Sequence, residues 1–258
     1  MKFARIIVID PNGPNAKMLA NLLKGLNPSC QVYGSTGAEH ALALARELNP
    51  DLIFVESTGP EIDGMKFARD LRRSDFACRE AAMVMVSADA TAGMILGARD
   101  AGIHEFLRRP YTMGDLQKRI DAVSGKPRDW IEAIQYIGPD RRRFNSADYS
   151  GPKKRRNDGS PKMAKINQAL KIVQSAVGAV ETDPVQAQRA LTTQARILVE
   201  VSNGQEQFRK LGAVAMHFQA YLTGTVVREN GLSREQVETF AANLVLVAPA
   251  ETRPQAAA

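Results

Sequence analysis

Two short runs, Asp51-Leu-Ile-Phe-Val55 and Met83-Val-Met-Val86, decide the fold, because nearly all of their residues are apolar. An unbroken apolar run of this length is typical of a strand that is buried on both faces of a parallel sheet. Three further runs have the character of strands: Arg5-Ile-Ile-Val-Ile9, Gln31-Val-Tyr33 and Glu105-Phe-Leu107. The sequence therefore predicts five strands in its first half.

Segments with helical spacing alternate with these runs. Their apolar faces consist of Ala16, Leu19, Leu22, Leu23 and Leu26; of Ala41, Leu44, Ala45 and Leu48; of Met65, Phe67, Ala68 and Leu71; and of Leu116, Ile120 and Val123. This alternation predicts an α/β fold in which right-handed crossovers place helices on both faces of a five-stranded parallel sheet. In the flavodoxin-like form of such a doubly wound sheet, the functional site is expected at the carboxyl ends of the strands.

The rest of the chain has a different character. We expect an α/β domain at residues 1–125, a basic and flexible linker or arm at 126–160, a small all-α domain at 161–248 and a disordered tail at 249–258. In the third region, apolar residues recur every three or four positions, as in an amphipathic helix. Asp183 before Pro184 and Ser233 before Gln236 are typical helix starts. A closed bundle and a homodimer formed through these helices both fit the pattern.

The excess of positive charge lies in the arm. The net charge is +6, and seven basic residues fall between Pro139 and Asp158: Arg141, Arg142, Arg143, Lys153, Lys154, Arg155 and Arg156. The segment Tyr136-Ile-Gly-Pro-Asp-Arg-Arg-Arg143 recurs as Tyr149-Ser-Gly-Pro-Lys-Lys-Arg-Arg156. A duplicated and clustered basic motif favours a binding element for an anionic partner.

Several function classes find no support in the composition. No apolar run reaches the ~18 residues of a membrane-spanning helix, and the first residues do not resemble a secretory signal. Cys30 and Cys78 form neither a metal-binding spacing nor a disulfide framework, which suits a cytoplasmic protein. The chain has no Gly-rich phosphate loop, metalloprotease motif or nucleophile elbow, so we expect no enzymatic activity.

The strand ends resemble those of response-regulator receiver domains, the CheY-like domains of two-component signalling. Ile6-Ile-Val-Ile-Asp10 resembles the first strand, which ends in the acidic site. Pro50-Asp-Leu-Ile-Phe-Val-Glu56 resembles the third strand and places Glu56 at the phosphoacceptor position. Met83-Val-Met-Val-Ser-Ala88 places Ser87 at the switch hydroxyl, and Phe106-Leu-Arg-Arg-Pro110 places Arg109 where the family has lysine. The resemblance implies a site made of Asp10, Glu56, Ser87 and Arg109.

These residues depart from the chemistry that the resemblance implies. Phosphorylation of a receiver needs an aspartate and a divalent cation held by carboxylates. Here Pro11 follows Asp10, so one carboxylate is missing, and Glu56 is one methylene longer than aspartate. The arginine is a planar fork rather than a compact charge. We therefore expect a pseudo-receiver without metal or phosphorylation, in which a Glu56–Arg109 pair either imitates the phosphorylated state or is inert scaffold.

The arm after the receiver resembles that of the Cle group of CheY-like proteins, which bind cyclic di-GMP. The resemblance is one of composition and position, and it does not cover the helical region. It implies a cyclic di-GMP site at Arg141, Arg142, Arg143, Arg155, Arg156 and Asp158. No other cofactor is expected.

Two kinds of macromolecular partner remain open from the sequence. Receivers commonly bind proteins through the face that here carries Arg99, Arg108, Tyr111 and Arg119. The expected function is therefore a phosphorylation-independent adaptor that works through protein contacts. The alternative is a constitutively active regulator, with Glu56 as phosphomimetic, whose basic arm binds DNA or RNA through phosphate contacts.

Overall fold

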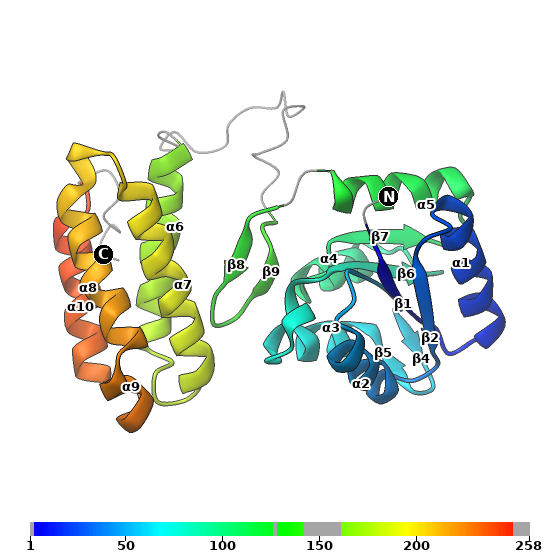
Figure 1. Ribbon diagram of the computed structural model, residues 1–258, viewed down its shortest axis with the longest axis horizontal. Coiled ribbons are helices and arrows are strands. Elements are labelled where there is room, and N and C mark those ends of the chain that lie inside the picture. Colours follow the sequence, from blue (N-terminus) through cyan, green and yellow to red (C-terminus); the bar gives the residue numbers. More distant parts are fainter. Residues whose placement is uncertain (1–2, 126–127, 142–160, 250–258) are drawn as a thin grey trace. The chain divides into compact units, whose positions relative to one another are not determined.

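A computed structural model describes residues 3–125, 128–141 and 161–249 of the chain (Figure 1). The chain divides into two compact units. The first contains residues 1–131 and 136–142, and the second contains residues 132–135 and 143–258. Each unit is described by itself.

The first unit contains a five-stranded parallel sheet with the order β2-β1-β3-β6-β7. Its strands are β1 (Arg5–Ile9), β2 (Gln31–Ser35), β3 (Leu52–Glu56), β6 (Ala82–Ser87) and β7 (Glu105–Arg108). All four neighbouring pairs are parallel. The predicted flavodoxin-like fold is confirmed, and each predicted strand lies at or within a few residues of its expected place.

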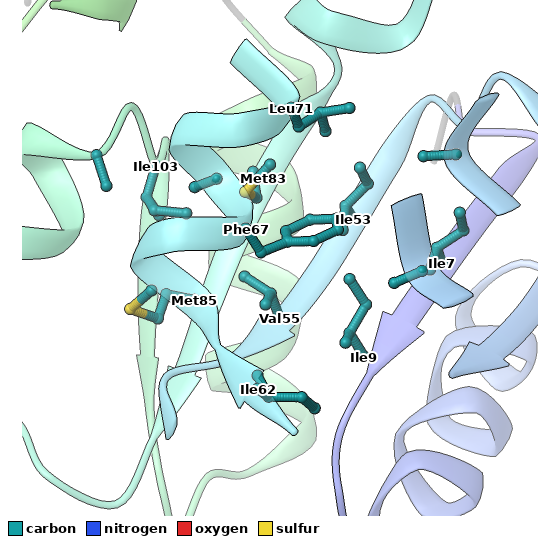
Figure 2. Packing of buried hydrophobic residues seen from close by; sticks show 14 of the residues in the cluster. Ile7, Ile9, Ile53, Val55, Ile62, Phe67, Leu71, Met83, Met85 and Ile103 are labelled. Carbon is teal, nitrogen blue, oxygen red and sulfur yellow. The ribbon is translucent and has the colours of Figure 1, made fainter. Parts of the chain in front are cut away.

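Both faces of this sheet are covered, which explains the unbroken apolar runs. Helices α2 (Ala38–Leu48), α3 (Gly64–Arg73) and α4 (Ala92–Asp100) pack on one face, together with Ile53 and Val55 of β3. Figure 2 shows this cluster, with Phe67 lying over the strands. Helices α1 (Gly13–Leu26) and α5 (Met113–Ser124) pack on the other face with Leu52 and Phe54. Successive residues of a strand therefore enter opposite cores.

Helix starts next to the sheet follow local capping chemistry. Asn12 accepts a hydrogen bond from the backbone N–H of Asn15 at the start of α1, and Asp63 accepts one from Lys66 at the start of α3. A reciprocal capping box joins Thr112 and Asp115 at the start of α5. A short antiparallel pair, β4 (Thr58–Gly59) and β5 (Ile62–Asp63), and a 3-10 turn, η1 (Ala77–Glu80), complete the connections. These caps fix the points where the chain leaves the sheet.

The described start of the predicted arm is folded. Residues 128–141 contain a two-stranded sheet of β8 (Trp130–Glu132) and β9 (Ile137–Pro139). Gly138 packs so closely on Gly102 that a Cβ added at Gly138 would lie 2.7 Å from the Gly102 Cα. Gly102 itself has a φ of +83°, a conformation that glycine adopts without strain. This part of the chain thus differs from the predicted flexible linker, because tertiary contacts order it.

Arg72 of α3 is the largest fully buried side chain of the described residues, and it organises this corner of the first unit. Its guanidinium donates to the carbonyl oxygens of Gly102 (3.0 Å from Nη2), Arg79 (2.5 Å) and Ala81 (3.0 Å). It also lies 5.1 Å from the ring centroid of Trp130. Burial lowers the pKa of Arg72 to about 10. The charge is therefore held in the interior by carbonyl oxygens rather than by a carboxylate.

The second unit is helical, as predicted. It consists of α6 (Pro161–Val177), α7 (Pro184–Ser202), η3 (Glu206–Phe208), α8 (Arg209–Thr223), the short α9 (Thr225–Asn230) and α10 (Arg234–Val247). Asp183 and Ser233 cap α7 and α10 at their expected positions. Within the described ranges, none of the helices is both long and apolar enough to cross a membrane.

Residues 132–135, the last residue of β8 and the turn after it, are part of this helical unit. Glu132 is buried there, and its carboxylate accepts a hydrogen bond from Gln186 (2.8 Å). The Glu132 carbonyl accepts one from Gln194 (3.1 Å). The expected division at residues 125 and 160 therefore differs from the observed units, because buried glutamine amides of α7 bind the backbone of a segment that the sequence places in the linker.

Candidate functional site

The four predicted site residues meet at one edge of the sheet. Asp10 directly follows β1, Glu56 ends β3, Ser87 ends β6, and Arg109 directly follows β7. Because the strands are parallel, these positions lie at their carboxyl ends, where a doubly wound sheet forms its site. The structure thus brings Asp10, Glu56, Ser87 and Arg109 together.

The Arg109 guanidinium bridges the two carboxylates. Its Nη2 lies 2.5 Å from Oδ2 of Asp10, and its Nη1 donates to Oε2 of Glu56. The Asp10 and Glu56 side chains are only 5% and 9% exposed, and that of Arg109 is 21% exposed. Two charge-assisted contacts from one planar group fix its orientation as well as its position. The sequence predicted the contact with Glu56 but not the one with Asp10.

The remaining carboxylate oxygens have backbone partners. Oδ1 of Asp10 accepts a hydrogen bond from the backbone N–H of Asn12 (2.8 Å). Oε1 of Glu56 accepts one from the backbone N–H of Ser57 (3.1 Å). Both buried anions are therefore paired and hydrogen-bonded, as burial of a charge requires. Each carboxylate is held by its own loop and by the shared arginine.

Ser57 is a site residue that sequence reasoning missed. Its hydroxyl lies 3.2 Å from Oε1 of Glu56 and 2.8 Å from Oγ of Ser87, and both serines are buried. The Ser87 hydroxyl also accepts a hydrogen bond from the backbone N–H of Asp89 (3.1 Å). The only sequence signal for Ser57 is its place directly after Glu56. Together these contacts tie the expected switch hydroxyl into the Glu56 network.

Tyr111 lies next to this network. Its hydroxyl is buried, and among the described residues no group completes a hydrogen bond to it with good geometry. Burial raises the pKa of Tyr111, and the positive charge of Arg109 opposes that rise. The hydroxyl therefore stays protonated and contributes no charge to the site at neutral pH.

The residues present do not fit the magnesium ion that receivers use. A hard divalent cation needs carboxylate oxygens that are free to coordinate it. Here the guanidinium nitrogens of Arg109 already contact both carboxylates, and Pro11 occupies the position of a third acid. Across the described ranges, no group of three acidic, histidine or cysteine side chains is arranged to hold a metal. The arginine thus supplies the positive charge of this site.

The residues of the expected protein-binding face differ in their ion pairs and in their exposure. Arg119 pairs with Glu105 (3.2 Å), and Arg99 lies 3.6 Å from Asp100. Arg108 is exposed, whereas Tyr111 is half-buried. Exposed Ile95 and Leu96 of α4 add apolar surface beside Arg99.

Of the predicted nucleotide-binding residues, the structure describes Arg141. Its guanidinium lies 3.6 Å from the ring centroid of Tyr136 and donates to Oδ1 of Asp100. The other five predicted ligands, Arg142, Arg143, Arg155, Arg156 and Asp158, lie outside the described residues. Arg141 is therefore anchored on the first unit at the base of the basic arm.

Comparisons with known proteins find similar sequences for the first half of the chain. The family model of the response regulator receiver domain matches residues 6–121. The chain is 26% identical over 115 residues to the KDP operon transcriptional regulatory protein KdpE of Escherichia coli, covering 45% of this chain and 48% of that one. It is 30% identical over 135 residues to the DNA-binding response regulator MtrA of Mycolicibacterium smegmatis, covering 52% and 56%.

A further relative and a solved structure are similar over the same part. The protein-glutamate methylesterase/protein-glutamine glutaminase of Trichodesmium erythraeum is 28% identical over 129 residues, which are 46% of this chain and 34% of that one. The chain thus spans about half, or less, of the length of these curated relatives. The structure of the Vibrio cholerae chemotaxis protein CheY4 covers 46% of this chain and 98% of its own, with 18% identity and a TM-score of 0.44.

Proposed function

Since residues 6–121 match the family model of the response regulator receiver domain, we propose that the chain is a signalling adaptor that works without phosphorylation. It acts through protein contacts and binds cyclic di-GMP through its arginine-rich arm. The observation that carries this proposal is the Arg109 guanidinium, which contacts Asp10 and Glu56 at once. The proposed protein is non-enzymatic.

The bridging arginine opposes phosphoryl transfer in two ways. It neutralises the carboxylates that would otherwise attract a divalent cation, and it covers Oε2 of Glu56, an oxygen that would attack phosphorus. The other oxygen of Glu56 accepts a hydrogen bond from Ser57. A nucleophile held in this way would have to lose a charge-assisted contact before it could react.

The same contacts support a fixed signalling state. In a switching receiver, the acceptor, the switch hydroxyl and the cationic residue rearrange with phosphorylation. Here Glu56, Ser57, Ser87 and Arg109 form one continuous network of buried or half-buried groups. Because these groups already bind one another, we expect the input, the signal that changes the state of the protein, to act at another part of the molecule.

The arm supplies the place for that input. Arginine stacks on bases and forks onto phosphates, and the arm contains arginines next to aromatic side chains. Its described base, Arg141, lies against Tyr136 and Asp100 of the first unit. A ligand at the arm would therefore act directly beside the end of α4, which belongs to the proposed protein-binding face.

Calorimetric titration of the intact chain with cyclic di-GMP tests the ligand. We expect saturable heat with micromolar affinity, and weaker or no heat with GTP and with short RNA. Because binding involves several arginines and phosphates, the affinity should fall as salt rises. No saturable heat up to high micromolar cyclic di-GMP would end this part of the proposal. Tight and strongly salt-dependent binding of RNA or random DNA would instead favour the nucleic-acid alternative.

A further inference from the structure

We propose that Arg99, Asp100, Tyr136 and Arg141 form a binding site for a guanine base and its phosphate, which we call the corner site. This inference rests on the proposed nucleotide-binding function and assigns it to named, described residues. All four residues belong to the first unit, with Arg99 and Asp100 at the end of α4 and Tyr136 and Arg141 on either side of β9.

The corner site contains a rigid stacking platform. Tyr136 is buried, and its hydroxyl donates to the carbonyl oxygen of Pro139 at 2.6 Å, so its ring is fixed. The Arg141 guanidinium lies over that ring at 3.6 Å from the centroid, and the Arg141 side chain keeps 31% of its surface exposed. A guanidinium is planar and stacks on nucleobases. A base can therefore lie on Arg141 from the side away from Tyr136.

Asp100 supplies the group that selects the base. Among the described residues, only Arg141 and Arg99 pair with its carboxylate, and both approach Oδ1. The Asp100 side chain is 53% exposed, and both arginines approach its other oxygen, so we assign Oδ2 to the ligand. Guanine presents two neighbouring N–H donors on its Watson–Crick edge, which match one carboxylate, whereas adenine presents an acceptor and a donor there. Asp100 therefore favours guanine over adenine.

A carboxylate at the position of Asp100 is unfavourable for the stability of α4. It is the last residue of α4, where the helix dipole is negative and a carboxylate is disfavoured. Two arginines converge on it instead of one. Arg99 is 49% exposed, so its guanidinium can also reach a phosphate attached to the bound nucleoside. An unfavourable carboxylate at a helix end, kept within a cluster of exposed and paired charges, is typical of a functional site.

A similar arrangement elsewhere in the first unit provides a matched control. Arg46 lies 4.7 Å from the ring centroid of Phe76 and 3.7 Å from Asp75. No second arginine is found at Asp75 in the described part of the chain, and the pair lies far in sequence from the basic arm. Variants at Arg46 and Asp75 remove the same kinds of side chain without affecting the corner site.

The test compares cyclic di-GMP with cyclic di-AMP by calorimetry on the full chain. We expect Asp100→Ala to weaken cyclic di-GMP binding roughly 10- to 100-fold, the usual effect of losing a charged hydrogen bond. Binding of cyclic di-AMP should hardly change, so the preference for guanine is lost. Arg141→Lys keeps the charge but not the planar face, and it should weaken both ligands. Asp75→Ala and Arg46→Ala should leave both affinities unchanged.

The outcomes separate this inference from the proposed function. If the wild-type chain binds cyclic di-GMP and Asp100→Ala and Arg141→Lys bind it equally well, the corner site is wrong and the proposed function stands. If GMP binds in an Asp100-dependent manner and cyclic di-GMP does not bind, the corner site stands and the cyclic di-GMP proposal fails. Absence of binding by any guanine nucleotide overturns both. Asp100→Asn, which keeps one oxygen, guards against loss of folding in the alanine variant.

Discussion

Replacing Arg109 by alanine should destabilise the first unit by about 3 kcal/mol at neutral pH, because breaking a buried ion pair leaves uncompensated charge. The variant leaves the carboxylates of Asp10 and Glu56, which are 5% and 9% exposed, facing each other without a cation. The same two carboxylates then become free to coordinate a hard divalent ion. Millimolar magnesium should therefore restore part of the lost stability of the variant by binding its folded state.

Urea unfolding with and without magnesium measures both effects. The chain has one tryptophan, Trp130, which lies in the first unit and reports its unfolding through fluorescence. Arg46→Ala removes an arginine whose partner Asp75 is 75% exposed, and it should cost less than about 1 kcal/mol. If magnesium stabilises the wild-type chain as strongly as it stabilises the Arg109→Ala variant, the arginine does not occupy the cation's place.

Replacing Arg72 by methionine should destabilise the first unit by about 4 kcal/mol. Methionine fills a similar volume, but the carbonyl oxygens of Gly102, Arg79 and Ala81 would lose their donors inside the protein. Each buried acceptor left unsatisfied costs roughly 1–3 kcal/mol. Loss of the guanidinium beside Trp130 should also change the fluorescence of the folded state.

Arg69→Met is the matched control on the same helix, since Arg69 is exposed. We expect its effect on the free energy of unfolding to stay within about 0.5 kcal/mol. Equal stability of the Arg72 and Arg69 variants in urea would mean that water replaces the guanidinium at the three carbonyls. In that case the Arg72 guanidinium would contribute little to the stability of the first unit.

The fold of the first unit could be predicted because its strands have an unambiguous pattern. Leu52 to Val55 alternate between two cores, so each of these four residues had to be apolar. The site followed from the fold, since parallel strands bring Asp10, Glu56, Ser87 and Arg109 to one edge. The contact between Arg109 and Asp10 was missed, because the geometry of a long side chain is not visible in residue spacing.

The folded structure of residues 128–141, in the predicted linker, could not be predicted for a similar reason. Glycines and prolines around residue 138 are typical of a loop, and the sequence does not show that Gly102 receives Gly138. Arg72 has the appearance of a surface residue on an amphipathic helix, although it is buried by contacts with Gly102, Arg79 and Ala81. In both cases tertiary contacts decide the structure, and local composition carries little sign of them.

Incubation of the intact chain with magnesium and acetyl phosphate, followed by intact-mass spectrometry, tests the central claim most directly. A phosphorylatable receiver taken through the same steps shows that the reagents work. With Arg109 on both carboxylates, the mass of this chain should remain unchanged. A stable increase by one phosphoryl group, located on Glu56 or elsewhere at this edge of the sheet, would contradict the account.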